Sequence, residues 1–307
     1  MIEGQEGVTW QQWCDLADAC ERHGVATLFR SDHYISMSNE AHNVAHDAWT
    51  TLAALAVRTT TLRLGTLVSP ATFRLPGLLA NAAATVDHIS GGRIELGLGG
   101  GWMEREHRAY GFPFPETSER VARFAEQLEI VHRLWTEERV DFRGTYYTLE
   151  DAPAQPKPLQ EPHPPILVGG GGKRGTAEPA ARFADEYNTP FVSPDEFARI
   201  RANVTAAAER AGRTLRCSTM TGCLIGESHA DALERARRLY DRSPREPDFE
   251  TWLDGYAQRS LIGSVDEVAE RLREYERAGC ERVMLQHLLH DELEPVELIG
   301  KLGQELV

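Results

Sequence analysis

A potential acid–base pair stands in the segment 29–34, F-R-S-D-H-Y, where Asp32 and His33 directly follow a predicted strand. The imidazole of histidine titrates near neutral pH, so His33 could give or take a proton at a bound ligand. A solvated Asp–His pair in an ordinary loop is the alternative. Because parallel α/β barrels place their catalytic groups at the carboxyl ends of strands, Asp32 and His33 are candidates for catalysis.

A glycine-rich strand end follows in the segment 90–102, S-G-G-R-I-E-L-G-L-G-G-G-W. It combines a helix stop, a short apolar strand, and a glycine run that ends at an aromatic residue. Glycine has no Cβ, so repeated glycine at a strand end lets the backbone approach a bulky flat ligand. We therefore predict that Gly99, Gly100, Gly101 and Trp102 border such a ligand.

A second glycine cluster occupies the segment 166–175, I-L-V-G-G-G-G-K-R-G. Gly170, Gly172 and Gly175 have the spacing G-x-G-x-x-G between a strand and a helix, as in dinucleotide-binding motifs. A Rossmann fold normally opens with this unit, however, whereas here several strand–helix units precede it. Free backbone N–H groups at a helix N-terminus attract anions, and Lys173 and Arg174 add positive charge. This cluster indicates a phosphate site, with a plain tight turn as the alternative.

Metal ligation has one candidate group, in the segment 41–47, A-H-N-V-A-H-D. His42 and His46 are four residues apart and Asp47 is adjacent, which would suit zinc on a helix. The motif H-E-x-x-H is not present, and no distant third ligand is evident, so we expect no metal. The five cysteines lack C-x-x-C spacing, which favours buried thiols over a zinc or disulfide framework.

A recurring unit, in which an amphipathic helix stops at glycine and a short apolar strand follows, must position these residues. Such helices begin near Thr9, Pro76 and Ser264 and stop at Gly24, Gly91 and Gly279. Helices that alternate with short apolar strands predict a parallel sheet. The predicted strands are Val25–Phe29, Leu62–Val68, Arg93–Leu98, Ile166–Gly169, Glu186–Thr189, Arg216–Ile225 and Arg282–Gln286.

These seven strands predict a (β/α)8 TIM barrel. The missing strand would come first in the chain and is shortened to the stump Met1–Gly4. We expect a single domain over residues 1–307, and a natural N-terminus that is truncated or misassigned. Insertion segments at 102–165 and 227–281 follow strands four and seven, where barrel enzymes place lids and substrate walls. The first is predicted to hold a helix near 118–135 and a hairpin.

Charge and hydropathy limit the partners of the chain. The formal net charge of −14 opposes binding to nucleic acid. No apolar run approaches the roughly 18 residues of a membrane span, and the N-terminal residues do not have the pattern of a signal peptide. We therefore expect a cytoplasmic protein that acts on a small molecule, with no nucleic-acid or membrane partner.

Several segments together resemble one known family. They are F-R-S-D-H-Y at 29–34, T-L-V-S-P-A at 66–71, the glycine-rich segment 87–102, E-H-R-A-Y-G-F-P-F-P at 106–115, I-L-V-G-G-G-G at 166–172 and the segment 262–286. They resemble the bacterial luciferase-like monooxygenase superfamily. Within it, they are most similar to the group that uses the deazaflavin coenzyme F420, although members that use FMN share the same scaffold.

The resemblance implies a site and an activity. Asp32 and His33 would stand at the ring, with His33 the candidate for proton transfer. Thr66 and Leu67 would bulge beneath the ring, often with a non-proline cis peptide. Gly99 to Trp102 would border the ring, while Gly170, Gly171 and Gly172, with Lys173 nearby, would hold the phosphate. The implied activity is hydride transfer between reduced F420 and a small organic substrate.

Other functions and features are kept open at this point. An FMN-dependent monooxygenase, a metal-dependent barrel hydrolase that uses His42, His46 and Asp47, and a non-catalytic flavin-binding protein are the alternatives. Trp102, Phe112, Phe114 and Trp252 could wall an apolar substrate, although aromatic residues often belong to the core. The resemblance also implies a homodimer formed through the segment 48–57.

Overall fold

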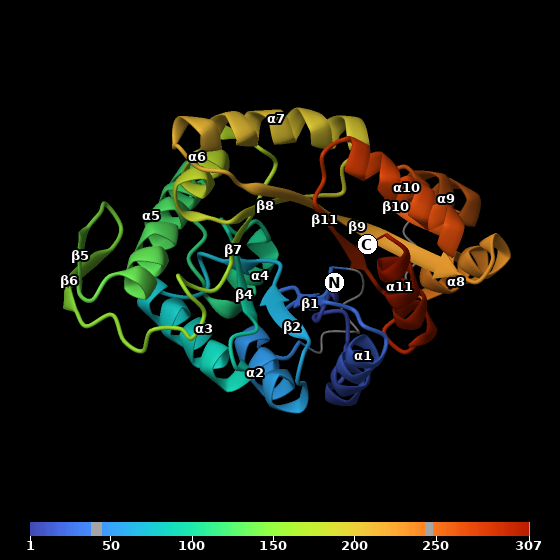
Figure 1. The fold of residues 1–307 in the computed structure, drawn as a ribbon, viewed down its shortest axis with the longest axis horizontal. Helices are drawn as coiled ribbons and strands as arrows, with labels where there is room; N and C mark the ends of the chain where they lie inside the picture. The colour runs from blue at the N-terminus through green and yellow to red at the C-terminus, as the bar shows by residue number, and fades with distance from the viewer. Residues whose placement is uncertain (38–44, 243–247, 307) are drawn as a thin grey trace.

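A computed structural model describes residues 1–37, 45–242 and 248–306, and it shows a parallel barrel surrounded by helices (Figure 1). The strands pair in parallel in the order β1-β2-β4-β7-β8-β9, and β11 pairs with β9. The predicted barrel is confirmed, and each of the seven predicted strands is present with bounds shifted by a few residues. These strands are β1 (Thr27–Arg30), β2 (Arg63–Thr66), β4 (Ile94–Gly99), β7 (Ile166–Gly169), β8 (Glu186–Pro190), β9 (Arg216–Gly226) and β11 (Arg282–Gln286).

The N-terminal stump joins the two ends of this sheet. Ile2 forms a parallel bridge with Arg30, and its backbone N–H donates to the carbonyl of Phe29 at 2.9 Å. On the other side, the amino group of Met1 donates to the carbonyl of Leu285 at 2.8 Å. In Figure 1 the N-terminus accordingly lies between β1 and β11. The stump therefore takes the place of the shortened first strand, as the sequence predicts.

The helices outside the barrel begin and end at the predicted signals. Thr9 with Gln12 and Ser264 with Glu267 form capping boxes, each of which satisfies amide groups at a helix N-terminus. Gly91 adopts the left-handed conformation, with a φ of 68°, that ends the third helix. The helices concerned are α1 (Trp10–Arg22), α2 (Ala48–Arg58), α3 (Pro76–Ser90), α6 (Arg174–Phe183), α7 (Pro194–Arg210), α10 (Val265–Arg277) and α11 (Glu294–Glu305).

The first insertion contains the predicted helix and hairpin, but the hairpin is not a lid. It holds α4 (Glu104–Tyr110), α5 (Thr117–Thr136) and the antiparallel strands β5 (Val140–Arg143) and β6 (Thr148–Ala152). Phe142 packs on Ile130 of α5, and the carboxylate of Glu126 accepts the backbone N–H of Thr145 at 2.7 Å. The hairpin thus lies along the outer side of α5 (Figure 1). Only the part of this insertion near α4 reaches the end of the barrel that carries Asp32 and His33.

The second insertion extends β9 past the barrel. It holds α8 (His229–Arg242), α9 (Phe249–Ala257) and β10 (Ser260–Ser264), which pairs with residues 222–226 of β9. Trp252 of α9 packs on Tyr256 and Phe249, with ring centroids 4.9 and 6.0 Å away. Trp252 therefore belongs to the apolar core of this insertion, and its interpretation as a substrate wall is replaced by its alternative, a core aromatic residue. Over the described ranges, no helix has the length and apolar character needed to cross a membrane.

Candidate active site

His33 is fixed at the carboxyl end of β1 by a glutamate that comes from the first insertion. Its Nδ1 lies 2.8 Å from Oε2 of Glu106, a fully buried residue of α4. The other oxygen of Glu106 accepts the backbone N–H groups of Tyr34 and Ile35. One carboxylate therefore orients both the imidazole and the loop that carries it. Within the part of the chain that the structure describes, Nε2 of His33 has no partner, which leaves this nitrogen for a ligand.

The protonation of His33 follows from the same contact. Burial alone would lower the pKa of the imidazole, but the hydrogen bond and the negative charge of Glu106 outweigh it and raise this pKa above its ordinary value. The side chain is 11% exposed, so ligands can still reach it. Trp102 stands edge-on to the imidazole at a centroid distance of 5.7 Å and is itself 61% exposed. An open aromatic wall thus borders a proton-binding group.

Asp32 lies beside this histidine, and its carboxylate is already paired with an arginine. Its buried carboxylate accepts hydrogen bonds from the hydroxyl of Ser69 at 2.7 Å and from Arg74 at 2.5 Å. Ser69 belongs to the two-residue strand β3 (Ser69–Pro70), and its hydroxyl in turn accepts the indole N–H of Trp49 at 3.1 Å. Because an arginine pairs with it, Asp32 is suited to position its surroundings and poorly suited to act as a base.

Asp47, a member of the suggested metal group, has a structural role instead. It caps α2 through the backbone N–H of Thr50 at 2.9 Å, and it accepts Arg74 at 2.7 Å and the hydroxyl of Tyr34 at 2.9 Å. Burial would raise its pKa, but these hydrogen bonds, led by the one from Thr50, and Arg74 lower it to about 2. His42 lies outside the described residues. Among the residues described, no group of three or more potential metal-ligating side chains gathers.

Glycine is required at the end of β4 for close packing at some positions, whereas another position faces open space. A Cβ on Gly97 would lie 2.0 Å from the carbonyl oxygen of Thr66, and one on Gly99 would lie 2.6 Å from Val68. These two glycines allow β4 to approach the segment between β2 and β3, where the non-proline cis peptide implied by the resemblance lies between Leu67 and Val68. A Cβ on Gly100, by contrast, would meet open space. Gly100 is therefore the position where the backbone is open to a ligand.

Gly101 and Trp102 complete this strand end. Gly101 has a φ of 78°, and a Cβ there would lie 2.6 Å from the hydroxyl of Thr72. The conformation that only glycine adopts easily turns the chain from β4 toward α4. Trp102 follows this turn, which explains how a residue after the glycine run comes to stand against His33.

The second glycine cluster, predicted to bind phosphate, has only part of its backbone open to a ligand. The N–H of Gly170 donates to the carbonyl of Asn188 at 2.9 Å, and that of Gly172 donates to the hydroxyl of Tyr187 at 2.8 Å. These two amides are therefore used within the protein. Gly171 faces open space, and the exposed Lys173 stands at the N-terminus of α6 without a side-chain cap. An anion would bind at Gly171, at Lys173 and at the first turn of α6.

Of the aromatic residues predicted to wall a substrate near this site, one is exposed to solvent and two pack against neighbouring side chains. Phe112 stacks on Phe73 with a centroid distance of 4.6 Å, and Phe114 packs between His107 and Arg120. Trp102 is the one of these that is open to solvent, with Tyr110 nearby in the cluster around Tyr34. Of these three residues, Trp102 is therefore the one most open to a substrate, and its role as a wall stays a prediction.

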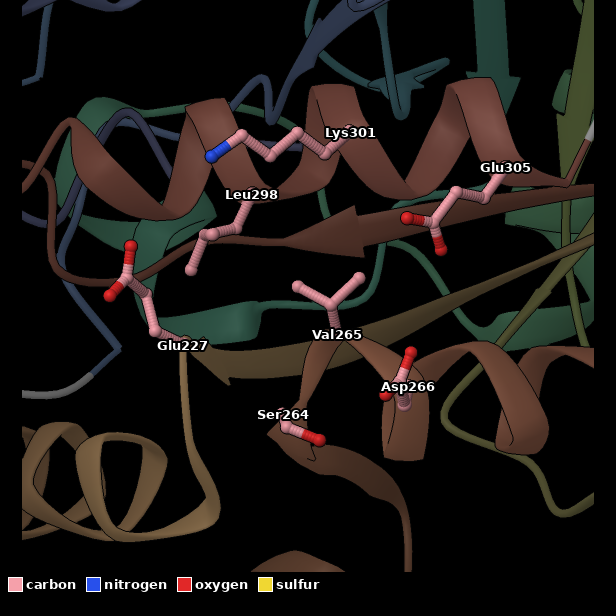
Figure 2. A pocket seen from close by; sticks show the side chains of 7 residues that line it. All are labelled: Glu227, Ser264, Val265, Asp266, Leu298, Lys301 and Glu305. Atoms are coloured by element: carbon pink, nitrogen blue, oxygen red, sulfur yellow. The ribbon is translucent and has the colours of Figure 1, made fainter.

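A pocket on the outside of the barrel does not contain an acid–base pair comparable to His33 and Glu106. It has a volume of about 260 Å³ and lies between α11 and the junction of β10 with α10 (Figure 2). Lys301, which Figure 2 shows at its rim, is paired with Glu297 at 2.9 Å. Its lining residues come from elements other than those that hold His33, so we place the candidate site at the carboxyl end of the barrel.

Sequence reasoning missed the residues that hold the two predicted catalytic groups. Glu106 stands in the segment E-H-R-A-Y-G-F, which was used for the resemblance without a role for its first residue. Arg74 stands two residues before α3 and shows no sequence pattern that marks it as a partner of Asp32. The sequence signal that could have identified Glu106 is its position as a carboxylate shortly after a glycine-rich strand end.

Comparison with known proteins settles the family. Residues 2–282 match the model of the luciferase-like monooxygenase family. The chain belongs to this family. The predicted membership is thus confirmed, together with the barrel fold and the oxidoreductase class. The match covers all of the candidate site residues described above.

The relatives include both kinds of enzyme that the sequence left open. An F420-dependent glucose-6-phosphate dehydrogenase of Nakamurella multipartita is 32% identical over 92% of this chain and 75% of that protein. An FMNH2-dependent dimethylsulfone monooxygenase of Pseudomonas putida is 26% identical over 83% of this chain and 77% of that protein. The crystal structure of the monooxygenase RslO1 from Streptomyces bottropensis superposes with a TM-score of 0.82 at 25% identity, covering 97% of this chain and 92% of that one.

Proposed function

We propose that the chain is an F420-dependent oxidoreductase that transfers a hydride between the coenzyme and a small organic substrate. The observation that carries this proposal is His33, whose Nδ1 is held by the buried Glu106 while Nε2 is left for a ligand beside the open indole of Trp102. The relative from Nakamurella multipartita supports F420 as the coenzyme, since its name states F420 dependence.

The residues present fit a flat, phosphorylated coenzyme. The open backbone at Gly100 suits a ring, and the open backbone at Gly171 with Lys173 suits a phosphate. The bound deazaflavin supplies hydride chemistry at its C5. His33 Nε2 gives a proton to the substrate oxygen when a carbonyl is reduced, and takes it back in the reverse direction. Glu106 stabilises the imidazolium, while Trp102 forms the apolar wall beside it.

A fluorescence titration of the purified protein with F420 and, separately, with FMN tests the coenzyme. We expect saturable binding of F420, with the affinity reduced in Lys173→Ala and much less reduced in Arg174→Ala. The difference is expected because Arg174 is already paired with Glu178 at 2.7 Å. If neither coenzyme bound, the proposal would be wrong.

An FMN-dependent monooxygenase is the second candidate function. The relative from Pseudomonas putida supports it, because its similarity extends over most of this chain. The same titration separates the two candidates, since tight binding of FMN without binding of F420 would favour the monooxygenase. A hydrolase would require bound metal, and a non-catalytic flavin-binding protein would show no turnover that depends on His33.

We further propose that the protein is a homodimer located in the cytoplasm. Within the segment 48–57, Leu52 and Leu55 are buried in the barrel's own core, whereas Val57 is 77% exposed. Leu75 at the start of α3 and Leu78 and Ile89 on α3 are also exposed, and α2 packs against α3. These four exposed side chains, Val57 with Leu75, Leu78 and Ile89, are called here the apolar stripe, and they support pairing of two copies.

A further inference from the structure

A cluster of polar side chains lies at the end of the barrel that carries His33 and takes no part in the site described above. We call it the Glu3 cluster, and its members are Glu3, Gln5, Ser31 and Gln286, all of which are buried. Ser31 follows directly after β1, and Gln286 is the last residue of β11. The cluster therefore joins the N-terminal segment to the carboxyl ends of both strands, next to the loop of His33.

Strand alternation turns Glu3 and Gln286 into the barrel. Met1, Phe29 and Met284 belong to an apolar cluster that is separate from the main core and draws its members from segments around the whole barrel, so it fills the barrel interior. Side chains two positions apart in extended backbone point to the same face. Glu3 therefore lies above Met1, and Gln286 lies above Met284, toward the carboxyl end. The Glu3 cluster thus forms a polar layer on top of an apolar one.

Hydrogen bonds to Glu3 fix the orientation of both glutamines. Its Oε1 accepts Nε2 of Gln286 at 2.7 Å, and its Oε2 accepts Nε2 of Gln5 at 2.8 Å. Because a carboxylate only accepts hydrogen bonds, each amide must turn its nitrogen toward Glu3 and its carbonyl oxygen away. The carbonyl of Gln5 accepts the hydroxyl of Ser31 at 2.5 Å. The side-chain carbonyl of Gln286 has no partner among the residues that the structure describes.

This polar layer therefore presents acceptors and a negative charge beside His33. The lone pairs of Glu3 that the two amides leave unused and the carbonyl of Gln286 can only accept. The charge of Glu3 also acts on His33: burial lowers the pKa of the imidazole, but the hydrogen bond and charge of Glu106 raise it, and the charge of Glu3 raises it further. Glu3 is thus within electrostatic reach of the group proposed to transfer the proton.

The arginines of the loops around His33 are already used by other groups. Arg74 is paired with two aspartates, whereas Arg105 and Arg120 donate to backbone carbonyls. A substrate anion beside His33 would meet the charge of Glu3 without a free partner among these three arginines. Like charges repel more strongly away from water, so this end of the barrel disfavours carboxylate and phosphate groups.

We propose that Glu3 and Gln286 form a substrate subsite that accepts a hydrogen bond from a neutral hydroxyl group and excludes anionic groups. The carbonyl of Gln286 binds the hydroxyl, while Glu3 orients this amide and supplies the charge. A substrate without the hydroxyl leaves the buried acceptor unpaired, and such sites discriminate strongly against it. The substrate class is then a small neutral compound with a hydroxyl group next to its reacting carbonyl. The reaction itself rests on the proposed function, whereas the binding does not require a coenzyme.

Binding of three matched probes to the coenzyme-free protein tests the subsite. Hydroxyacetone carries the neutral hydroxyl group, acetone lacks it, and pyruvate has a carboxylate in its place. NMR shifts of the His33 ring protons report the binding of each probe. We expect hydroxyacetone to bind at least about tenfold more tightly than acetone or pyruvate.

Two variants separate the charge from the acceptor. Glu3→Gln keeps the shape of the side chain but removes its charge, so pyruvate should bind at least about tenfold more tightly than it does to the wild type. Gln286→Leu removes the acceptor, so hydroxyacetone should bind no more tightly than acetone, while pyruvate stays excluded. Glu104→Gln, which removes an exposed charge on α4, is the control and should change none of these affinities.

The outcomes for the subsite and for the reaction are distinguishable. Equal binding of hydroxyacetone and acetone to the wild type, or an unchanged affinity for pyruvate in folded Glu3→Gln, would overturn the subsite even if the enzyme turned over other substrates with F420. If F420 did not bind but the expected order of probes and its change in Gln286→Leu were observed, the subsite would be supported and the proposed coenzyme would be wrong. With F420 bound, the same order should appear in kcat/KM for carbonyl reduction.

Discussion

Two neighbouring residues, Asp32 and His33, have different electrostatic surroundings, and this difference assigns their roles. Asp32 is paired with the guanidinium of Arg74, which occupies the carboxylate. His33 is paired with Glu106, an anion, so its proton is held more tightly than in water. The candidate for proton transfer is therefore His33, while Asp32, Arg74 and Asp47 keep the surrounding loops in place.

Replacement of His33 by alanine tests this assignment. We expect kcat for His33→Ala to fall by about 10²–10⁴-fold, the usual contribution of general acid–base catalysis. Coenzyme affinity, measured by fluorescence titration, should change by less than about threefold, because the glycine backbone remains. His229→Ala, an exposed histidine of α8, serves as the control and should leave kcat unchanged. Full activity of His33→Ala would remove His33 from the mechanism.

Replacement of Glu106 by glutamine tests the electrostatic coupling. The amide keeps the shape of the side chain but loses the negative charge that raises the pKa of His33, so this pKa should fall in Glu106→Gln. NMR titration of the His33 ring protons would show its midpoint at lower pH, and the corresponding limb of the kcat/KM profile should move the same way. Glu104→Gln, on the exposed side of the same helix, should move neither. An unchanged midpoint in Glu106→Gln would contradict the coupling.

At the scale of elements, the end of β4 shows how one glycine run both packs against its neighbours and leaves the backbone open. Gly97 and Gly99 allow the backbone of β4 to contact Thr66 and Val68, whereas Gly100 borders no protein atom where its Cβ would stand. The strand must therefore pack tightly just before the point at which it opens to a ligand. The Leu67–Val68 segment is held by β4 on one side and by the ends of the neighbouring strands on the other.

Matched alanine substitutions separate these two purposes. Gly97→Ala would force a Cβ against the carbonyl of Thr66, so we expect a loss of about 1–3 kcal/mol in the free energy of unfolding, measured by denaturant titration. Gly100→Ala has open space and should keep wild-type stability, yet weaken coenzyme binding by about tenfold or more. Equal stability losses in the two variants, or unchanged coenzyme affinity in Gly100→Ala, would contradict this division.

At the scale of the whole molecule, the apolar stripe on α2 and α3 is exposed apolar surface that the barrel itself does not need. Val57, Leu75, Leu78 and Ile89 are exposed on adjacent helices that pack on the barrel through their opposite faces. With a formal charge of −14 the chain repels its own copies, so a stable pair requires apolar burial of this kind. The stripe thus gives the predicted homodimer a specific surface.

A charge placed in this stripe tests the homodimer. Leu78 is 65% exposed, so Leu78→Glu should fold normally but shift the molar mass in light scattering from that of a dimer to that of a monomer. Leu159→Glu introduces the same charge at another exposed leucine, outside the stripe, and should leave the dimer intact. A wild-type monomer, or a dimer that persists in Leu78→Glu, would show that the stripe is not the interface.

The sequence by itself determined the barrel, because each unit carries local signals. The capping boxes at Thr9 and Ser264, the glycine stops and the short apolar strands depend on neighbours a few residues apart, and the structure has them where they were predicted. The same holds for the family, since the motifs around Asp32, Gly99 and Gly170 are contiguous segments. The assignment of residues 1–307 to a single domain stays a prediction.

The tertiary structure alone decided which residues act together. Glu106 reaches His33 across 73 positions of sequence, and Arg74 reaches Asp32 across 42. Such partners are set by the way in which the ends of separate strands converge on one rim, and local sequence carries no record of that convergence. For the same reason, the sequence could not show that Gly99 packs against Val68 while Gly100 is open, or that Trp252 is part of the core.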